Sequence, residues 1–300
     1  MSADKWLNCR LRDLQACLQQ KAHTASLPVV SRLLRQHDYR LRANEKSDEG
    51  KSPEQRDAQF RYLQEQRQEF LDAGEPVLSI DTKKKELVGN FKNAGQVWCQ
   101  EAEVVNVHDF ASQSVGKAVP YGVYDLIHNL GTVYVGQSAD TAEFAVDNLA
   151  HWWEYERPER FPDATQLLVH ADCGGSNGAR CKLFKQQLQD KLADRFGIDV
   201  TVCHLPTGCS KWNPVEHRLF SEISKTWAGC PLRSFETILE YLRDTTTQTG
   251  LRVAAHLVTK VYQKGLDVTK EVMATLNITY HTVCPQWNYT IRPRVERASA

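Results

Sequence analysis

The sequence lacks the signals of a secreted or membrane-embedded protein. Its nine cysteines are scattered over 300 residues and no Cys-x-x-Cys pair occurs, so neither a disulfide framework nor a paired-cysteine metal site is indicated. The stretch from Met1 to Leu18 is charged throughout, which does not fit a signal peptide. No apolar run approaches the length of a membrane span. These absences predict a reduced, cytoplasmic protein without a membrane partner.

The chain also lacks an excess of either charge. Its 37 Lys and Arg residues balance 37 Asp and Glu residues, so an interaction with nucleic acid has to come from local basic patches. A hydrophobic content of 41% is that of an ordinary globular protein and is enough to build a sizeable core. The length predicts one large domain with a smaller one, or two domains of moderate size.

The amino-terminal part is basic and carries a helical pattern. Between residues 10 and 46, eight Lys and Arg residues oppose three acidic ones. Leucines recur at helical spacing over 7–18, and capping signals predict a second short helix over 27–35 with Arg32 and Arg35 exposed. This second helix fits the recognition half of a helix-turn-helix, in which both arginines would contact DNA. A solvated amphipathic helix explains the same pattern equally well.

Polar residues with glycine and proline over 44–56 form the best linker candidate. A polar helix is expected to follow this stretch. We therefore expect four parts along the chain: a partial helical DNA-binding segment over 1–46, a linker and helix over 47–75, a main domain over 76–294 and a tail over 295–300.

Apolar runs in the main domain predict strands and helices. Strands are expected at about 77–81, 120–127, 132–137, 167–171 and 199–204. Helices are expected over about 141–156 and 179–196, and from Pro214 onward, whereas the segment 82–118 is polar and is expected to be irregular. Three early strands followed by alternating helices and strands predict an α/β fold, in which a mixed sheet is covered by helices on both faces.

Three acidic residues occupy positions that suit metal binding. Asp81 and Asp172 each end an apolar strand run, where side chains gather in the crevice at a sheet edge. Glu216 falls in the first turn of a predicted helix, with Asn213 as its N-cap. Taken singly, such residues are more often turn or helix caps.

Together, the three carboxylates match what a two-metal phosphoryl-transfer site requires. Mg²⁺ prefers oxygen ligands, and two ions about 3.5–4 Å apart can hold the attacking and leaving oxygens of an in-line displacement. Asp81 is the expected bridge between the ions, with Asp172 and Glu216 as flanking ligands.

Basic residues lie beside these acids in the sequence. Lys83, Lys84 and Lys85 closely follow Asp81, and Lys211 and Arg218 flank Glu216. We expect these side chains to contact DNA phosphates, for which lysine serves as a point charge. The alternative is that the lysine run is simply an exposed, solvated turn.

Five ordered motifs identify a family resemblance. The chain resembles the ISAzo-type insertion-sequence transposases, which carry the Rhodopirellula-type transposase domain. The resemblance extends over about residues 27–294 and rests on the stretches Ser79–Glu86, Gly116–Asp125, His170–Gly178, Ser210–Phe220 and Trp287–Pro293.

The resemblance implies a D-D-E transposase whose catalytic core, over 76–294, is ribonuclease-H-like. By resemblance, Asp81, Asp172 and Glu216 would be the catalytic and metal-binding triad for two Mg²⁺ ions, with Mn²⁺ able to substitute. Water would cleave a strand at the element's ends, and the freed 3′-hydroxyl would attack target DNA without a covalent enzyme intermediate. The implied partners are the DNA of the element ends and of the target, bound by a homo-oligomer.

Two departures from the family pattern bear on these expectations. Members begin with a longer helical DNA-binding region, and this chain is expected to start partway through it. Cys173 also stands where the family often has Gly, and a thiol beside Asp172 could bind a softer metal. The alternative functions are a non-catalytic DNA-binding remnant of a transposable element and a related ribonuclease-H-like nuclease.

Overall fold

The computed structural model describes residues 9–40 and 55–294. The chain divides into two compact units, residues 1–50 and residues 51–300, and each is described by itself. Most of the predicted linker over 44–56 and all of the predicted tail over 295–300 lie outside the described residues. Among the described residues, no helix combines the length and the apolar character needed to cross a membrane.

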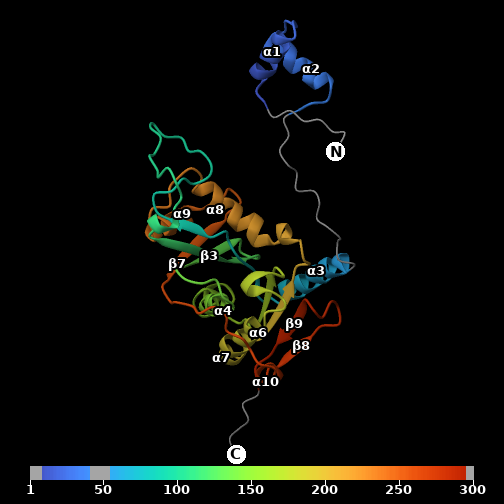
Figure 1. The fold of residues 1–300 in the computed structure, drawn as a ribbon. Helices are drawn as coiled ribbons and strands as arrows, with labels where there is room; N and C mark the ends of the chain where they lie inside the picture. Colours follow the sequence, from blue (N-terminus) through green and yellow to red (C-terminus); the bar gives the residue numbers. More distant parts are fainter. Residues whose placement is uncertain (1–8, 41–54, 295–300) are drawn as a thin grey trace, which may run out of the picture. The chain divides into compact units, whose positions relative to one another are not determined.

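The first unit contains two short helices, α1 (Leu11–Gln20) and α2 (Leu27–Gln36), which are labelled in Figure 1. The side-chain amide of Gln15 donates to the carbonyl of Ala25 at 2.7 Å and holds the connection between them. Val30 is the buried residue of α2, and Arg32 and Arg35 are exposed. The second helix predicted over 27–35 is therefore present.

The second unit is built on a nine-stranded mixed sheet. Its centre has the order β4-β3-β1-β5-β6, in which β1, β3 and β4 are antiparallel and β5 and β6 run parallel to β1. This is the strand order of the ribonuclease-H-like fold, so the predicted fold class is confirmed. The central strands are β1 (Val77–Thr82), β3 (Gly116–Asp125), β4 (Leu130–Gly136), β5 (Gln166–Ala171) and β6 (Asp199–His204).

Further strands extend this centre. At one edge β7 (Arg252–Val258) runs parallel to β4, and at the other β9 (Asn288–Ile291) and β8 (Ile278–Tyr280) add antiparallel. The short β2 (Glu86–Val88) pairs with the start of β3. The expectation of an irregular segment over 82–118 is therefore wrong at both ends. The three-residue strand β2 follows the lysine run directly and forms its ladder with β3.

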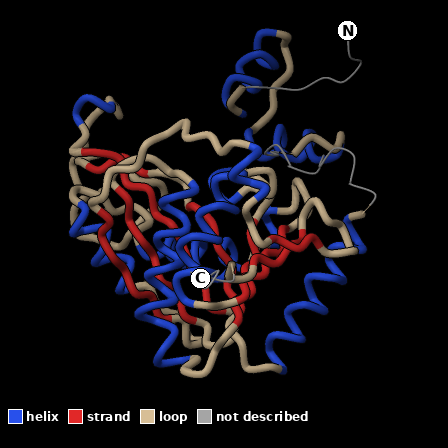
Figure 2. The backbone as a smooth tube through the Cα atoms, turned by 90° about the horizontal axis from the view of Figure 1, so that it is seen from below, coloured by secondary structure: helices blue, strands red, loops and turns tan. Residues whose placement is uncertain are grey.

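Helices cover both faces of the sheet (Figures 1 and 2). One face carries α4 (Ala142–His151) and α6 (Lys182–Leu188), whose apolar residues pack on Leu78 and Ile80 of β1. The other face carries α3 (Arg56–Asp72), α9 (Phe235–Asp244) and a helix over 214–226, hereafter the Glu216 helix. The alternation of apolar side chains along β1 thus supplies both cores.

Several predicted helices are interrupted by wider, π-helical turns. Such turns are η2 (Trp152–Glu156), η4 (Gln189–Ala193) and, in the Glu216 helix, η6 (Glu216–Phe220), which α8 (Ser221–Thr226) continues. A π-helical turn inserts one residue into an α-helix and is frequent at functional sites. The remaining short helices are α5 (Arg157–Arg160), α7 (Asp194–Phe196), α10 (Lys270–Ala274), η1 (Ala111–Gln113), η3 (Gly175–Asn177) and η5 (Ser210–Trp212).

Candidate active site

Asp81 lies on β1, and Asp172 directly follows the neighbouring parallel strand β5. Ser79 of β1 is paired with His170 of β5, and each aspartate follows its strand partner by two residues. The two-residue period of a strand places both carboxylates on one face, and neighbouring strands lie about 4.8 Å apart. The structure therefore brings these two residues together at the carboxyl ends of β1 and β5.

Glu216 reaches the same place from the helix above the sheet. It opens the π-helical turn of the Glu216 helix, and its carboxyl group lies close enough to that of Asp81 for the two to influence each other's pKa. The charge of Asp172 also acts on Glu216. All three predicted acids are thus neighbours, although they come from three separate elements.

Asn213 joins the Glu216 helix to β1 in a way that its sequence position did not predict. Its side chain was expected to cap the helix, but its Oδ1 accepts a hydrogen bond from Ser79 Oγ at 2.5 Å. Its Nδ2 donates to the carbonyl of Ile80 at 3.3 Å. The backbone N–H of Val215, in the first turn, donates instead to Ser79 Oγ at 3.0 Å. A serine on a strand therefore caps the helix.

Two glycines allow the Glu216 helix to lie directly on the sheet. Gly122 of β3 is paired with Asp81, and a methyl carbon there would lie 2.5 Å from Cε1 of Phe220. A methyl carbon at Gly131 of β4 would lie 2.4 Å from Cδ1 of Leu219. Both distances are shorter than van der Waals contact. Side chains at these strand positions would hold the helix, and Glu216 with it, away from Asp81.

The electrostatics of the three acids are those of a cation site. Burial raises the pKa of Asp81 from its ordinary value of 3.8 to about 8, and the charges of Asp172 and Glu216 contribute to this rise. Burial also raises the pKa of Asp172 and of Glu216. Of the three acids, Asp81 is therefore the one that holds a proton most readily at neutral pH.

The donor atoms fit a hard divalent cation. Three carboxylates offer only oxygen ligands, which is the preference of Mg²⁺ and Mn²⁺. Among the described residues, however, no group of three His, Cys, Asp or Glu side chains already stands in a metal-holding arrangement.

The thiol of Cys173, next to Asp172, takes no part in this donor set. Its Sγ donates to the carbonyl of Leu205 at 2.9 Å. Burial raises the pKa of this thiol to about 11, so it stays protonated at neutral pH, and a protonated thiol is a poor metal ligand. The structure therefore gives no support to the binding of a softer metal at this residue.

Two residues that the sequence did not single out support the backbone of Asp172. Nδ1 of His204 donates to the carbonyl of Asp172 at 2.8 Å, and burial lowers the pKa of His204 to about 4, so the imidazole is neutral. The fully buried Gln59 of α3 donates to the carbonyl of His204 at 2.8 Å. In the sequence, His204 is only the last residue of an apolar strand.

Lys83 differs from the expectation that it contacts DNA at the surface. Its side chain is turned into the protein and only 8% of the residue is exposed. The ammonium lies 3.6 Å from Glu86 and 4.7 Å from the ring centre of Trp227, and its charge acts on Glu216. Lys83 therefore belongs to the wall of the acidic site.

The other lysines of the run lie at the surface. The side chain of Lys84 is exposed, and that of Lys85 forms an ion pair with Asp140 at 3.0 Å. Both line a pocket of about 350 Å³ together with Lys92 and Lys117. The remaining predicted DNA contacts are also exposed: Lys211 and Arg218 in the second unit, and Arg32 and Arg35 in the first.

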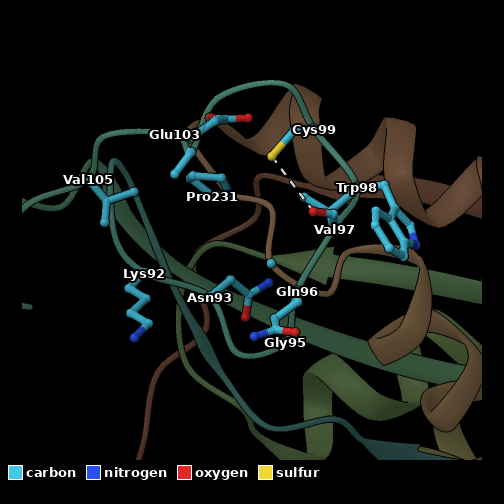
Figure 3. Close-up of a pocket in the computed structure, with 12 residues that line it drawn as sticks. Lys92, Asn93, Gly95, Gln96, Val97, Trp98, Cys99, Glu103, Val105 and Pro231 are labelled. Carbon is cyan, nitrogen blue, oxygen red and sulfur yellow. Dashed lines mark hydrogen bonds between the residues drawn. The ribbon is translucent and has the colours of Figure 1, made fainter.

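The longest connection near the site, residues 89–115 between β2 and β3, exposes apolar side chains. Trp98 is fully exposed, and so in large part are Val97, Val104, Val107, Phe110 and Val115. The connection forms a pocket of about 640 Å³ with Gly229 and Pro231, shown in Figure 3. The three acids do not line this pocket, so it is a feature separate from the acidic site.

Comparison with known proteins identifies the family. The model of the Rhodopirellula transposase DDE domain matches residues 1–293. None of the curated proteins matches the chain.

Among solved structures, the Mos1 transposase paired-end complex with left transposon end is 12% identical, with a TM-score of 0.47 over 81% of this chain and 73% of that one. The Mos1 mariner paired end complex with Mn is 14% identical, with a TM-score of 0.47 over 81% and 74%. These two likenesses are too distant to support an argument about the site. The family model, in contrast, spans nearly the whole sequence, and the chain therefore belongs to the family of the Rhodopirellula transposase DDE domain and is a transposase.

Proposed function

We propose that this transposase performs metal-dependent cleavage and strand transfer of insertion-sequence DNA, with Asp81, Asp172 and Glu216 as the ligands of two Mg²⁺ ions. The observation that carries the proposal is the convergence of these residues: Asp81 on β1, Asp172 directly after the neighbouring parallel strand β5, and Glu216 at the start of the helix that Ser79 holds against β1. The intact triad leaves no observation that favours a non-catalytic remnant.

Each acid has its own part in the proposed site. Asp81 would bridge the ions while Asp172 and Glu216 hold one each, and the charges of both of these acids act on it. When bound, the ions activate the attacking oxygen and stabilise the leaving one. Asp81 must first lose its proton, and Lys83 would balance part of the charge left on Glu216.

Exposed basic residues around the site would bind the DNA backbone. Lys84, Lys85, Lys92 and Lys117 line one pocket, and lysine acts on phosphates as a point charge. Lys211 and Arg218 stand on either side of Glu216 in the sequence and are exposed, as are Arg32 and Arg35 on α2. We assign all of these except Lys83 to contacts with element or target DNA.

The connection over 89–115 supports the proposal of a homo-oligomer on DNA. Large exposed apolar patches on soluble proteins mark sites of association, and the side chain of Trp98 has no cover in the single chain. A second copy of the chain, brought close by binding to paired DNA ends, would cover part of this surface. The Sγ of Cys99 donates a hydrogen bond to the carbonyl oxygen of Val97 at 3.7 Å (Figure 3). This bond joins the residues on either side of Trp98.

The test is an in vitro cleavage and joining assay on supercoiled DNA that carries the element's own ends, in Mg²⁺. The variant Asp81→Asn preserves size and removes the bridging carboxylate, so cleavage and joining should fall by at least about a thousandfold. Asp199→Asn is the matched control, because Asp199 lies in the same sheet and forms an ion pair with Arg292 at 3.2 Å. Wild-type activity of the Asp81→Asn protein, with DNA binding unchanged, would refute the assignment.

A further inference from the structure

We infer that Ser79 and Asn213 are positioning residues that set the separation between Asp81 and Glu216 before any ion binds. The inference rests on the proposed function, because it concerns the metal site formed by these acids. Ser79 precedes Asp81 by two residues on β1, and Asn213 precedes Glu216 by three. A contact between Ser79 and Asn213 therefore fixes two ligands that are far apart in the sequence.

Hydrogen bonds join the two side chains to each other and to the neighbouring backbone. Ser79 Oγ donates to Asn213 Oδ1 at 2.5 Å and accepts from the N–H of Val215 at 3.0 Å. Asn213 Nδ2 donates to the carbonyl of Ile80 at 3.3 Å. Both residues are completely buried. Breaking one of these hydrogen bonds would leave a buried polar group without a partner, which costs free energy. The Ser79–Asn213 contact therefore resists small displacements.

The contact between Ser79 and Asn213 opposes the electrostatic repulsion among the three carboxylates, which would otherwise move them apart. Three carboxylates at close range repel one another when they are ionised. The Glu216 helix is the movable partner, since Asp81 and Asp172 are held in neighbouring paired strands. Hydrogen bonds at the start of this helix resist its movement away from the sheet.

The close packing of the Glu216 helix on Gly122 and Gly131 adds to the effect of the Ser79–Asn213 hydrogen bonds. With Phe220 and Leu219 seated on the bare backbone of β3 and β4, the helix has little freedom to slide along the sheet. The hydrogen bonds of Ser79 and Asn213 then hold its first turn to β1. Residues that orient metal ligands in this way commonly change metal affinity by about ten- to a hundredfold when removed.

The experiment measures Mg²⁺ binding without DNA, by calorimetry and by the Mg²⁺ dependence of thermal unfolding, in the full chain. The variants are Ser79→Ala and Asn213→Ala, with Ser79→Cys as a milder replacement if Ser79→Ala does not fold. The control is Thr201→Val, which also removes a buried hydroxyl hydrogen bond from the sheet, the one between Thr201 and Thr290 at 2.8 Å, but lies on β6 away from the acids.

The expected result is that the Mg²⁺ concentration at half-saturation rises about tenfold or more in the Ser79 and Asn213 variants and is unchanged in Thr201→Val. In the cleavage assay, high Mg²⁺ should restore part of the rate to the Ser79 and Asn213 variants. Equal Mg²⁺ affinity in all variants, with only thermal stability reduced, would overturn the inference and leave the proposed function intact. If the parent protein shows no Mg²⁺ binding that Asp81→Asn abolishes, both the inference and the proposed function fail.

Discussion

The acidic site and the connection over 89–115 have opposite physical chemistry, although both adjoin β3. Asp81 lies on β1, which pairs with β3, and the connection leads into β3. At the acidic site, polar side chains such as Ser79 and Asn213 are fully buried and bonded to each other. In the connection, large apolar side chains such as Trp98 lie in solvent. The first region is completed by the chain itself, whereas the second exposes surface that would gain from a partner.

This contrast separates two ways of organising a site. Buried hydrogen-bonded groups place the carboxylates before any ligand arrives, which lowers the reorganisation needed for catalysis. Exposed apolar residues do nothing for the isolated chain and stabilise only an assembly. Substitutions in the two regions should therefore affect different measurements.

Among substitutions outside the three acids, Gly122→Ala is expected to have the largest effect on stability and cleavage. The added methyl group would lie 2.5 Å from Phe220 and 3.1 Å from Cγ2 of Val215, so the Glu216 helix must shift away from β3. We expect a loss of about 1–3 kcal/mol in the free energy of unfolding and a loss of cleavage of about a hundredfold, because Glu216 moves relative to Asp81. Denaturant unfolding and the cleavage assay measure the two effects.

Gly250→Ala is the comparison for this substitution. Nothing lies within 4 Å of the added carbon at Gly250, although its φ of +90° adds backbone strain. It should therefore cost stability without reducing cleavage at saturating Mg²⁺. Full cleavage activity in Gly122→Ala would show that the close approach of the helix is not needed.

The second effect is a dependence of stability on pH. The pKa of Asp81 is about 8 in the folded protein, against an ordinary value of 3.8, so the folded state binds a proton that the unfolded state releases between these values. Without metal, the contribution of Asp81 to stability is complete below about pH 4 and is lost as pH rises to about 8, by at most about 1.4 kcal/mol per pH unit.

Mg²⁺ should reverse this trend, because it binds the ionised carboxylate and stabilises the folded state more as pH rises. Urea unfolding at several pH values, with EDTA or with Mg²⁺, measures both dependences. Asp81→Asn carries no titrating group at this position and should lose the part of both dependences that Asp81 contributes, while the raised pKa of Asp172 and of Glu216 leaves a smaller pH dependence. An unchanged pH profile in that variant would mean that another group is responsible.

The smallest effect on the isolated chain is expected from Trp98→Ser. Because the side chain of Trp98 is fully exposed, its removal should change the free energy of unfolding by less than about 0.5 kcal/mol. Assembly of the DNA-bound oligomer should weaken severalfold, as measured by sedimentation with DNA that carries the element's ends. The same assembly in Trp98→Ser and the parent would remove the support that this connection gives to the oligomer proposal.

Much of the fold could be predicted from residue patterns. The strand over 199–204 was predicted with its observed bounds, and the strand over 167–171 begins only one residue earlier, at Gln166. These strands are buried apolar runs, whose period and length are visible locally. The strand β2 was missed because it has only three residues and directly follows a lysine run, and its pairing with β3 is not visible in the sequence.

Within the acidic site, the sequence supplied the residue types but not their contacts. Asp81, Asp172 and Glu216 stand out by their positions at element ends, and the five motifs name the family. The inward turn of Lys83 was not predictable, because a lysine run is normally solvated and only the neighbouring Trp227 and Glu86 bury this one. The role of Asn213 was likewise read as a local cap, since its true partner Ser79 is remote in the chain.

By itself, the sequence determined the order of the five central strands along the chain, the choice of three candidate acids and the membership of a transposase family, because these depend on local periodicity and on ordered motifs. Only the tertiary structure decided that β1 and β5 pair in the register that aligns Asp81 with Asp172. It also decided that Ser79 caps the Glu216 helix and that Gly122 admits Phe220. Such contacts depend on strand pairing and close packing between distant segments, and the free energy that selects them exists only once the sheet and its helices have come together.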